Sequence, residues 1–303
     1  MKRTLMRDLR ALAIYLLAPA VGLLLTGSIA GAQEPVEGTL YTFHCAGTGA
    51  TVATDINDSG TIVGRCSVSG SWHGFIYTKG ESYADGSVTL LDVPGATATE
   101  AWGINEQGEV VGFYYKGGDP TYHGFVRRLS GDYETIDRQG EMNTMPEDIN
   151  DGGYVAGCVH NNGLMHGFVF SGDAFLSIEP ATSMHTGVNE SGTLVGYGFT
   201  PPAGAASFIL SGVDRIDFSY PGATNTQAWG LNQAGDVVGW YGVAASSKGF
   251  LRLHAAPLGQ PDDQFKQVAI AGAAWTRAFG INEAGVIVGG YAQDGIHGFV
   301  LVQ

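Results

Sequence analysis

Positive charge is scarce in this sequence, which has 15 Lys and Arg against 29 Asp and Glu and a formal net charge of −14. Removing residues 1–32, the expected signal segment described below, leaves 11 basic against 28 acidic residues, a net charge of −17. So acidic a chain repels nucleic acid and anionic lipid surfaces. We therefore expect no nucleic-acid partner, and no membrane partner once that segment is removed.

Cysteine is also scarce. The three cysteines are Cys45, Cys66 and Cys158, and an odd number excludes a fully paired disulfide framework. At most one internal bridge can form, and Cys45 and Cys66, which lie near each other in the first repeat, are the favoured pair if it does. The alternative is that all three are small buried apolar residues.

Long apolar runs are confined to the N-terminus. Basic residues precede an apolar run from Ala11 to Leu25, which is followed by Ala30-Gly31-Ala32. This pattern predicts a secretory signal peptide over 1–32 and a mature domain over 33–303, located outside the cell or in the periplasm. A membrane anchor is the alternative, but the run contains Pro19 and is shorter than the roughly 20 apolar residues of a spanning helix.

One short pattern recurs six times in the remaining chain. Its copies include DINDSGTIVG, GINEQGEVVG and GLNQAGDVVG, and the repeated Asn residues are separated by 48, 45, 39, 43 and 50 positions. A Gly follows each Asn after three positions and again after seven. Asn favours a turn and Gly accepts a positive φ, so the pattern predicts a tight hairpin between two strands. The repeated turn residues are Asn57, Asn105, Asn150, Asn189, Asn232 and Asn282, with Gly60, Gly108, Gly153, Gly192, Gly235 and Gly285.

Two further strands follow each hairpin. The third opens with His-Gly-Phe in four repeats, at His73, His123, His166 and His297. Fourth strands are expected at 88–93, 133–137, 175–179, 215–219 and 265–270. Four strands recurring every 39 to 50 residues predict an all-β, six-bladed β-propeller with four-stranded antiparallel blades. An open β-solenoid is the alternative.

The two chain ends predict closure of the ring. The last repeat stops after its third strand, whereas an extra strand, TLYTF, occupies 39–43. Phe43 precedes Asn57 by 14 positions, the spacing at which Leu91, Ile136, Phe218 and Val268 in other fourth strands precede their own Asn. We therefore expect this N-terminal strand to complete the sixth blade and to remove an exposed sheet edge.

The pattern GINxxGxVVG followed by HGF resembles the HAF repeat family of probable extracellular bacterial proteins over about residues 39–303. Gly replaces the family's Ala at positions such as Gly74 and Gly124, and the fourth and fifth repeats lack the His. The resemblance implies export and repetition. It implies no agreed activity.

Two kinds of metal site suggest themselves. The HGF histidines offer imidazole ligands, although a repeated His that bonds a neighbouring loop is the stronger interpretation. The turns DINDSG and DINDGG resemble the start of a calcium loop, which offers Asp55, Asn57, Asp148 and Asn150 as oxygen ligands. Position 12 of such a loop would be Cys66 or Val159 rather than Glu, so a plain hairpin turn is the competing interpretation. Ca²⁺ is the one cofactor that the sequence suggests.

Strand parity suggests a ligand in the central channel. Positions two and four before the repeat Asn should share one face, which brings together Asp55, Asp148 and His185 among small residues. If that face lines the channel, a cation or a small polar ligand could bind there. Aromatic residues near the strand ends, such as Trp102, Trp229, Trp240 and Trp275, offer a second binding surface, although packing between blades is the favoured interpretation.

Two hypotheses for function follow. The first is a secreted, non-catalytic binding or scaffold module whose loop-bearing face recognises an extracellular polymer, surface component or protein. The alternative is a propeller hydrolase or lyase that acts on a glycan or lactone through Asp55 and Asp148, with Ca²⁺ as an optional cofactor. The sequence contains no GxSxG, HExxH, P-loop or dinucleotide motif, which favours the first hypothesis.

Overall fold

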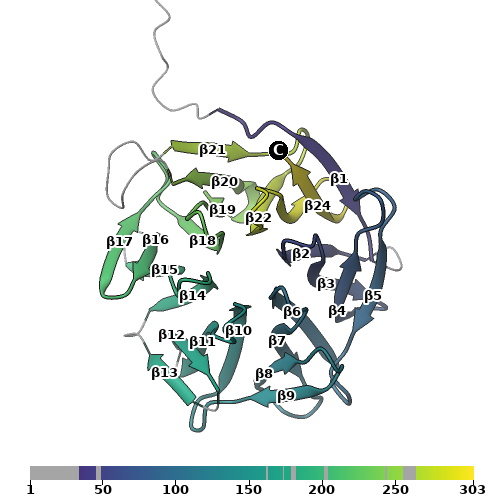
Figure 1. Cartoon of the computed structure of the whole chain (residues 1–303), viewed down its shortest axis with the longest axis vertical. Coiled ribbons are helices and arrows are strands. Elements are labelled where there is room, and N and C mark those ends of the chain that lie inside the picture. The colour runs from purple at the N-terminus through teal and green to yellow at the C-terminus, as the bar shows by residue number, and fades with distance from the viewer. Residues whose placement is uncertain are drawn as a thin grey trace, which may run out of the picture. The chain divides into compact units, whose positions relative to one another are not determined.

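Six four-stranded antiparallel sheets surround a common axis (Figure 1), so the predicted six-bladed β-propeller is confirmed. The computed structural model describes residues 34–45, 49–161, 163–172, 174–178, 182–200, 204–242, 244–254 and 264–303, and Gln33–Gln303 form one compact unit. The expected signal segment, 1–32, lies outside the described residues. Among the described residues, no helix is long and apolar enough to cross a bilayer.

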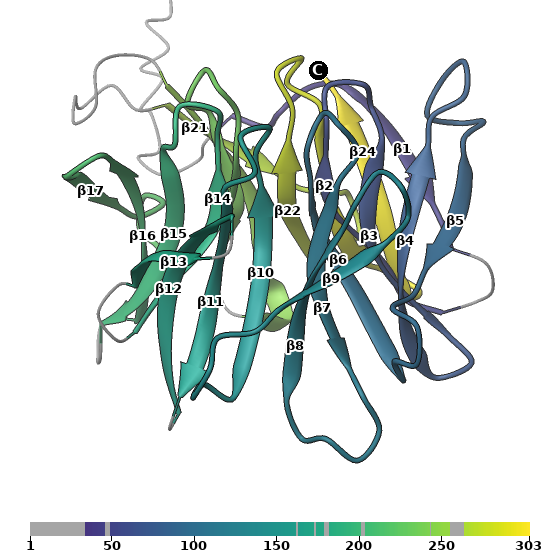
Figure 2. The ribbon, with the colours of Figure 1, turned by 60° about the horizontal axis from the view of Figure 1, so that its bottom comes forward.

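Each blade runs from an inner first strand to an outer fourth strand (Figure 2). The first strands are β2 (Thr51–Ile56), β6 (Ala98–Ile104), β10 (Asn143–Ile149), β14 (Ser183–Val188), β18 (Thr226–Leu231) and β22 (Trp275–Ile281). The second strands are β3 (Ile62–Val68), β7 (Val110–Tyr115), β11 (Val155–Asn161), β15 (Leu194–Thr200), β19 (Val237–Tyr241) and β23 (Ile287–Ala292). The third strands are β4 (Ser71–Thr78), β8 (Tyr122–Arg127), β12 (Leu164–Ser171), β16 (Gly204–Ser211), β20 (Lys248–Leu253) and β24 (Ile296–Val302). The fourth strands are β5 (Ser87–Leu91), β9 (Tyr133–Ile136), β13 (Ala174–Ile178), β17 (Asp214–Phe218), β21 (Gln264–Val268) and β1 (Thr39–Phe43). One 3-10 helix, η1 (Ala244–Ser246), precedes β20.

The repeated Asn-x-x-Gly forms the predicted hairpin turn. In the first blade, Gly60 donates its N–H to the carbonyl of Asn57 at 3.0 Å, and Asn57 donates to the carbonyl of Thr61 at 3.1 Å. All six turn glycines have a positive φ, between 73° and 89°. A side chain would be strained in that conformation, which is why Gly recurs there.

The second glycine of each repeat makes room for a phenylalanine. Gly64 lies opposite Phe75, and a Cβ at Gly64 would lie 2.6 Å from the Phe75 ring. The equivalent phenylalanines are all fully buried, and each contributes roughly 1.5–3 kcal/mol through burial. They are Phe75, Phe125, Phe168, Phe208, Phe250 and Phe299.

The N-terminal segment closes the ring as predicted. β1 pairs with β24 from Thr39↔Val302 to Phe43↔Gly298 and so completes the sixth blade. Ahead of β1, Val36 donates its N–H to the carbonyl of Gln267 in the fifth blade at 2.9 Å. After β1, the disulfide between Cys45 and Cys66 fixes the chain to the first blade, which confirms the expected pair. Cys158 is free and buried.

The repeat asparagines join all six blades in a closed ring of hydrogen bonds. Each Asn side chain accepts an N–H from the residue four positions later in its own turn, as Asn150 does from Tyr154 at 3.0 Å. Each side-chain amide also donates to the carbonyl of the Asn in the next blade, as Asn150 does to Asn189 at 2.9 Å. The last of these bonds, from Asn282 to Asn57, returns to the first blade at 3.1 Å. All six asparagines are buried, so the residue that forms the turn also fixes the spacing of the blades.

Candidate functional site

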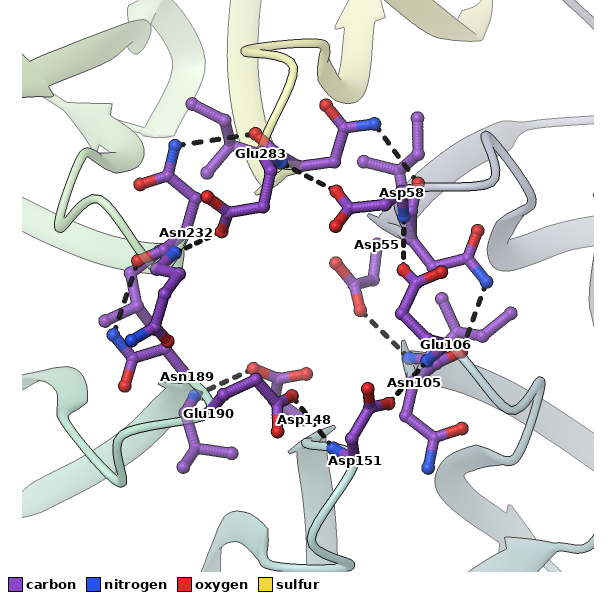
Figure 3. A pocket seen from close by; sticks show the side chains of 18 of the residues that line it. Asp55, Asp58, Asn105, Glu106, Asp148, Asp151, Asn189, Glu190, Asn232 and Glu283 are labelled. Atoms are coloured by element: carbon purple, nitrogen blue, oxygen red, sulfur yellow. Dashed lines mark hydrogen bonds between the residues drawn. The ribbon is translucent and has the colours of Figure 1, made fainter.

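An acidic cavity of about 310 Å³ opens on the axis at the end of the propeller that carries the Asn-x-x-Gly turns, here called the turn face. The residue that follows each repeat Asn lines it, and Figure 3 shows these side chains around the opening. Five of them are acidic and one is Gln, which makes an acid ring of Asp58, Glu106, Asp151, Glu190, Gln233 and Glu283.

Backbone-to-carboxylate hydrogen bonds join five of the six neighbouring pairs in the acid ring. Glu106 donates its backbone N–H to the carboxylate of Asp151 at 2.8 Å, and Asp151 donates to Glu190 at 2.9 Å. Glu283 donates to Asp58 at 2.8 Å, and Asp58 and Gln233 donate in the same way to Glu106 and Glu283. The pKa of Glu106 is raised by burial and by the neighbouring charges of Asp58 and Asp151. These carboxylates therefore hold neighbouring blades together while they line an open cavity.

Asp55 and Asp148 come together at the base of this cavity, as the channel hypothesis predicted. A carboxylate oxygen of Asp55 accepts the N–H of Ile104 in the second blade at 2.9 Å. Asp148 accepts the N–H of Ile149 at 2.8 Å and that of Val188 in the fourth blade at 2.7 Å. Burial raises the pKa of Asp55 to about 7, and burial together with the charge of Asp55 raises that of Asp148 well above its usual value.

His185 does not join them, so the prediction that it lines the channel was wrong. Its ring is fully buried, bonds the carbonyl of Phe168 at 3.2 Å and packs on Phe208. Burial lowers its pKa to about 4. The cause is a β-bulge in every first strand, which falls between His185 and Gly187 in this blade. A bulge adds one residue, so positions two and four before the Asn no longer share a face.

The predicted metal ligands serve the turns and blade contacts. Oδ1 of Asn57 accepts the N–H of Thr61 at 2.9 Å, and Oδ1 of Asn150 accepts that of Tyr154 at 3.0 Å. Within the described ranges, no group of three or more His, Cys, Asp or Glu side chains could hold a metal ion. The turn interpretation therefore accounts for these oxygens, and a calcium ion is not needed to explain the motif.

Three of the HGF histidines, His73, His123 and His297, contact acidic loop residues. Nδ1 of His73 lies 3.0 Å from the carboxylate of Asp92, and His123 lies between Asp119 and Asp137 at 3.1 and 2.8 Å. Nε2 of His297 lies 2.7 Å from Asp294. The histidines thus fix the loops beside the third strands, in agreement with their structural interpretation.

Three aromatic side chains meet on the axis below the acidic cavity. Trp102, Trp229 and Phe279 occupy the bulge position of their first strands, and their ring centroids lie 5.2 to 6.1 Å apart. Glu147 occupies the same position in the third blade and is buried beside them. Burial raises the pKa of Glu147 well above its usual value, and the charge of Glu100 raises it further. The axis is therefore filled at mid-height.

A second polar surface lies toward the opposite end, here called the loop face, where second strands turn into third strands and the chain passes between blades. The guanidinium of Arg65 lies 5.1 Å from the centroid of Trp72 and 5.0 Å from that of Trp102. The guanidinium of Arg277 lies 4.5 Å from Trp240 and 4.9 Å from Trp275. We call these six side chains the Arg–Trp cluster: Arg65, Trp72, Trp102, Trp240, Trp275 and Arg277.

The cluster combines a buried floor with partly exposed edges. Trp102 and Trp240 are 7% exposed and belong to one buried aromatic group with Phe279. Trp72, Trp275 and Arg277 are half-buried, and the side chain of Arg65 is 28% exposed. The prediction that the aromatics pack between blades holds for Trp240, which lies against Arg277 of the next blade, whereas Trp102 packs on the axis. The edges leave aromatic surface open to a ligand.

Comparison with known proteins identifies no family. No family model matches this chain, and no curated protein matches it. Solved structures do match it. Trypanosoma rangeli sialidase in complex with the inhibitor DANA has a TM-score of 0.54 at 5% identity, and the match covers 84% of this chain and 54% of the sialidase.

Smaller propellers match over most of their length. The SapL1 lectin in complex with alpha methyl fucoside has a TM-score of 0.50 at 12% identity, covering 83% of this chain and 92% of the lectin. The gluconolactonase XC5397 from Xanthomonas campestris matches with a TM-score of 0.49 at 11% identity, covering 90% and 97% of the two chains. At these identities the sialidase and SapL1 matches, with TM-scores of 0.54 and 0.50, show the propeller fold alone.

Proposed function

We propose that this protein is an exported, non-catalytic propeller that binds a carbohydrate at the Arg–Trp cluster. The observation that carries the proposal is the placement of partly exposed indole rings and two guanidiniums around the axis on the loop face. A sugar presents an apolar C–H face that stacks on an aromatic ring, while its hydroxyls accept hydrogen bonds from charged donors. The cluster supplies both groups side by side.

The cluster is preorganised for such a ligand. Each guanidinium stacks on two indoles, and Nε of Arg277 donates to Oγ of Ser247 at 3.0 Å. Nη1 of Arg65 donates to Oε2 of Glu100 at 2.5 Å. Fixed side chains lose little rotamer freedom when a ligand binds, which lowers the cost of association. The arrangement therefore supports binding without rearrangement of the blades.

Binding is favoured over hydrolysis because Asp55 and Asp148, the paired acids of the channel, are held in hydrogen bonds to neighbouring blades. Asp55 and Asp148 each accept a backbone N–H from a neighbouring blade, and they line the turn-face cavity rather than the loop face. A carboxylate held in this way stabilises the ring. The Arg–Trp cluster itself offers stacking surfaces and cationic donors.

Export and membership of the HAF repeat family belong to the same proposal. The basic and apolar N-terminal segment, 1–32, and the GINxxGxVVG repeats support them. Expression of the full chain in a bacterial host, followed by mass spectrometry of the product outside the cytoplasm, tests export. We expect a mature chain that begins near residue 33, and retention of the intact chain in the cytoplasm would refute this part.

Isothermal titration calorimetry against a panel of neutral and acidic oligosaccharides tests carbohydrate binding. We expect the wild-type protein to bind at least one member, and Trp72→Ala and Trp275→Ala each to weaken that binding about tenfold, as loss of a stacking platform should. Tyr154→Ala is the matched control, since Tyr154 is 43% exposed on the turn face. Full binding by both Trp variants would place the ligand elsewhere.

The alternative function is hydrolysis of a glycan or lactone in the turn-face cavity. The raised pKa values of Asp55 and Asp148 favour it, because a proton-sharing pair of acids is a common arrangement for acid–base catalysis. Turnover of a sugar or lactone that Asp55→Asn and Asp148→Asn abolish, but Trp72→Ala does not, would support this alternative over the binding proposal.

A further inference from the structure

We infer that the sugar bound at the Arg–Trp cluster carries a carboxylate, as a uronic acid unit of an acidic glycan does, and that Arg65 and Arg277 bind this group. The inference rests on the proposed carbohydrate binding and adds the charge of the ligand. It assigns the guanidiniums a charged partner, whereas any sugar, charged or neutral, would stack on the indoles.

The first supporting observation is that both guanidiniums lie over one aromatic floor. Arg65 stacks on Trp102 and Arg277 stacks on Trp240, and these two indoles belong to the same buried group. Arg65 projects from the first blade and Arg277 from the sixth, so the two side chains approach the axis from adjacent blades. The charge of Arg65, after burial itself, lowers the pKa of Arg277. Two like charges held this close favour an anion between or beside them.

The second observation is that Arg65 is only partly engaged by its acidic partner. Nη1 bonds Glu100, and the side chain of Arg65 remains 28% exposed. Nε is closed to solvent, so a ligand would contact the exposed part of the guanidinium rather than Nε. Guanidinium groups match carboxylates in shape and charge, so a carboxylate suits this exposed part.

Two acidic side chains face these arginines. Glu100 pairs with Arg65, with Nη1 of Arg65 2.5 Å from Oε2 of Glu100. Glu147 lies nearby, and its burial raises the pKa of its carboxyl well above the usual value, which disfavours the charged form beside the guanidiniums. Most of the axial carboxylates lie at the other end, in the acid ring and at Asp55 and Asp148. The carboxylates of the turn-face cavity are thus separated from Arg65 and Arg277, which lie toward the loop face.

In this inference, stacking and charge recognise different parts of the ligand. The indole edges of Trp72 and Trp275 contact the apolar face of the sugar ring, and the guanidiniums contact the carboxylate at C5. A neutral sugar of the same shape keeps the stacking and loses the charged pair. We therefore expect the acidic sugar to bind more tightly than the neutral sugar of the same shape, and the neutral sugar still to bind.

Calorimetry with matched ligands tests the inference. The probes are oligosaccharides of galacturonate, guluronate and glucuronate, each compared with its methyl ester, which removes the charge and keeps the ring. We expect at least one acid form to bind the wild-type protein about tenfold or more tightly than its ester. Arg277→Gln and Arg65→Gln should each reduce this ratio, while affinity for the ester changes little. Arg128→Gln, which breaks ion pairs with Glu109 and Glu134 instead, should leave the ratio unchanged.

The outcomes separate the inference from the proposed function. Equal affinity for every acid and its ester would overturn the carboxylate inference and leave carbohydrate binding intact, whereas no binding of any sugar would remove both. Poly-glutamate that binds as tightly as the uronates would show that the site recognises carboxylates without a sugar, which also overturns the inference. If a Gln variant fails to fold in a thermal melt, Arg277→Lys keeps the charge, and it should retain part of the preference because Lys cannot bond bidentately.

Discussion

Replacing Asn150 with Ala removes one member of the asparagine ring and should lower stability markedly. The change deletes the acceptor for the N–H of Tyr154 and the donor to the carbonyl of Asn189, at 3.0 and 2.9 Å. Asn150 is 4% exposed, so its partners lose their bonds with little access to water. A buried polar group left without a partner costs about 1–3 kcal/mol, and the Tyr154 N–H at the turn surface is at the lower end of that range. We expect a loss of about 3 kcal/mol.

The hydrogen bonds of the asparagine ring differ in length, so alanine variants at two of the asparagines can be compared. Asn232 has the same turn bond to Asp236 at 2.9 Å, but its amide lies 3.4 Å from the carbonyl of Asn282, a longer and weaker bond. Asn232→Ala should therefore cost about half as much as Asn150→Ala, roughly 1.5 kcal/mol. Gln107→Ala, an exposed change in a neighbouring turn, is the control and should cost less than about 0.5 kcal/mol.

Urea unfolding followed by tryptophan fluorescence measures these differences, and thermal melts provide a second readout. For a domain of this size, 3 kcal/mol corresponds to a fall in Tm of about 6–12 °C. Asn150→Asp adds a test of the donor, because it keeps the acceptor and places a carboxylate against the carbonyl of Asn189. The difference in unfolding free energy between Asn150→Asp and the wild type should become smaller at acidic pH, where the carboxyl is protonated and can donate. If Asn150→Ala melts like the Gln107→Ala control, the ring does not hold the blades together.

Three further predictions concern closure, packing and pH. Deletion of residues 33–44 removes the strand that pairs with β24 and should lower Tm sharply in calorimetry, and an unchanged melt would discard the closed ring. Gly157→Ala would place a Cβ 2.6 Å from the Phe168 ring and should cost about 1–3 kcal/mol in urea unfolding, so a wild-type midpoint would contradict the packing described for this repeat. The pKa of Asp55 is raised from 3.8 to about 7, so the folded state binds the extra proton and stability should fall as pH rises between these values and then level off. Asp55→Asn should reduce that slope, and an equal slope in variant and wild type would refute the assignment.

The fold was largely predictable, because each repeat specifies its own strands and turns and the number of strands left over at the two chain ends shows how the ring closes. Asn and Gly at fixed spacing specify a turn, and a 14-residue spacing identified the N-terminal strand as the missing fourth strand. The turn and the spacing can both be identified from the sequence because the same pattern recurs in the repeats. The inter-blade bonds of the asparagine amide could not be predicted, since they depend on the radius at which the ring closes.

The sites were harder to predict for two reasons. Strand parity placed Asp55 and Asp148 correctly and His185 wrongly, because a bulge shifts the face within each first strand and no residue type marks it reliably. The acid ring did have a signal, since the residue after each repeat Asn is acidic in five copies. Arg65 and Arg277 had none, because their positions carry a different residue in the other repeats.

The structure of the protein with a bound uronate oligosaccharide tests the account most directly. We predict a sugar ring against Trp72 or Trp275 on the loop face, with a carboxylate oxygen about 3 Å from a guanidinium nitrogen of Arg65 or Arg277. A sugar seated instead in the acidic turn-face cavity, between Asp55 and Asp148, would contradict it.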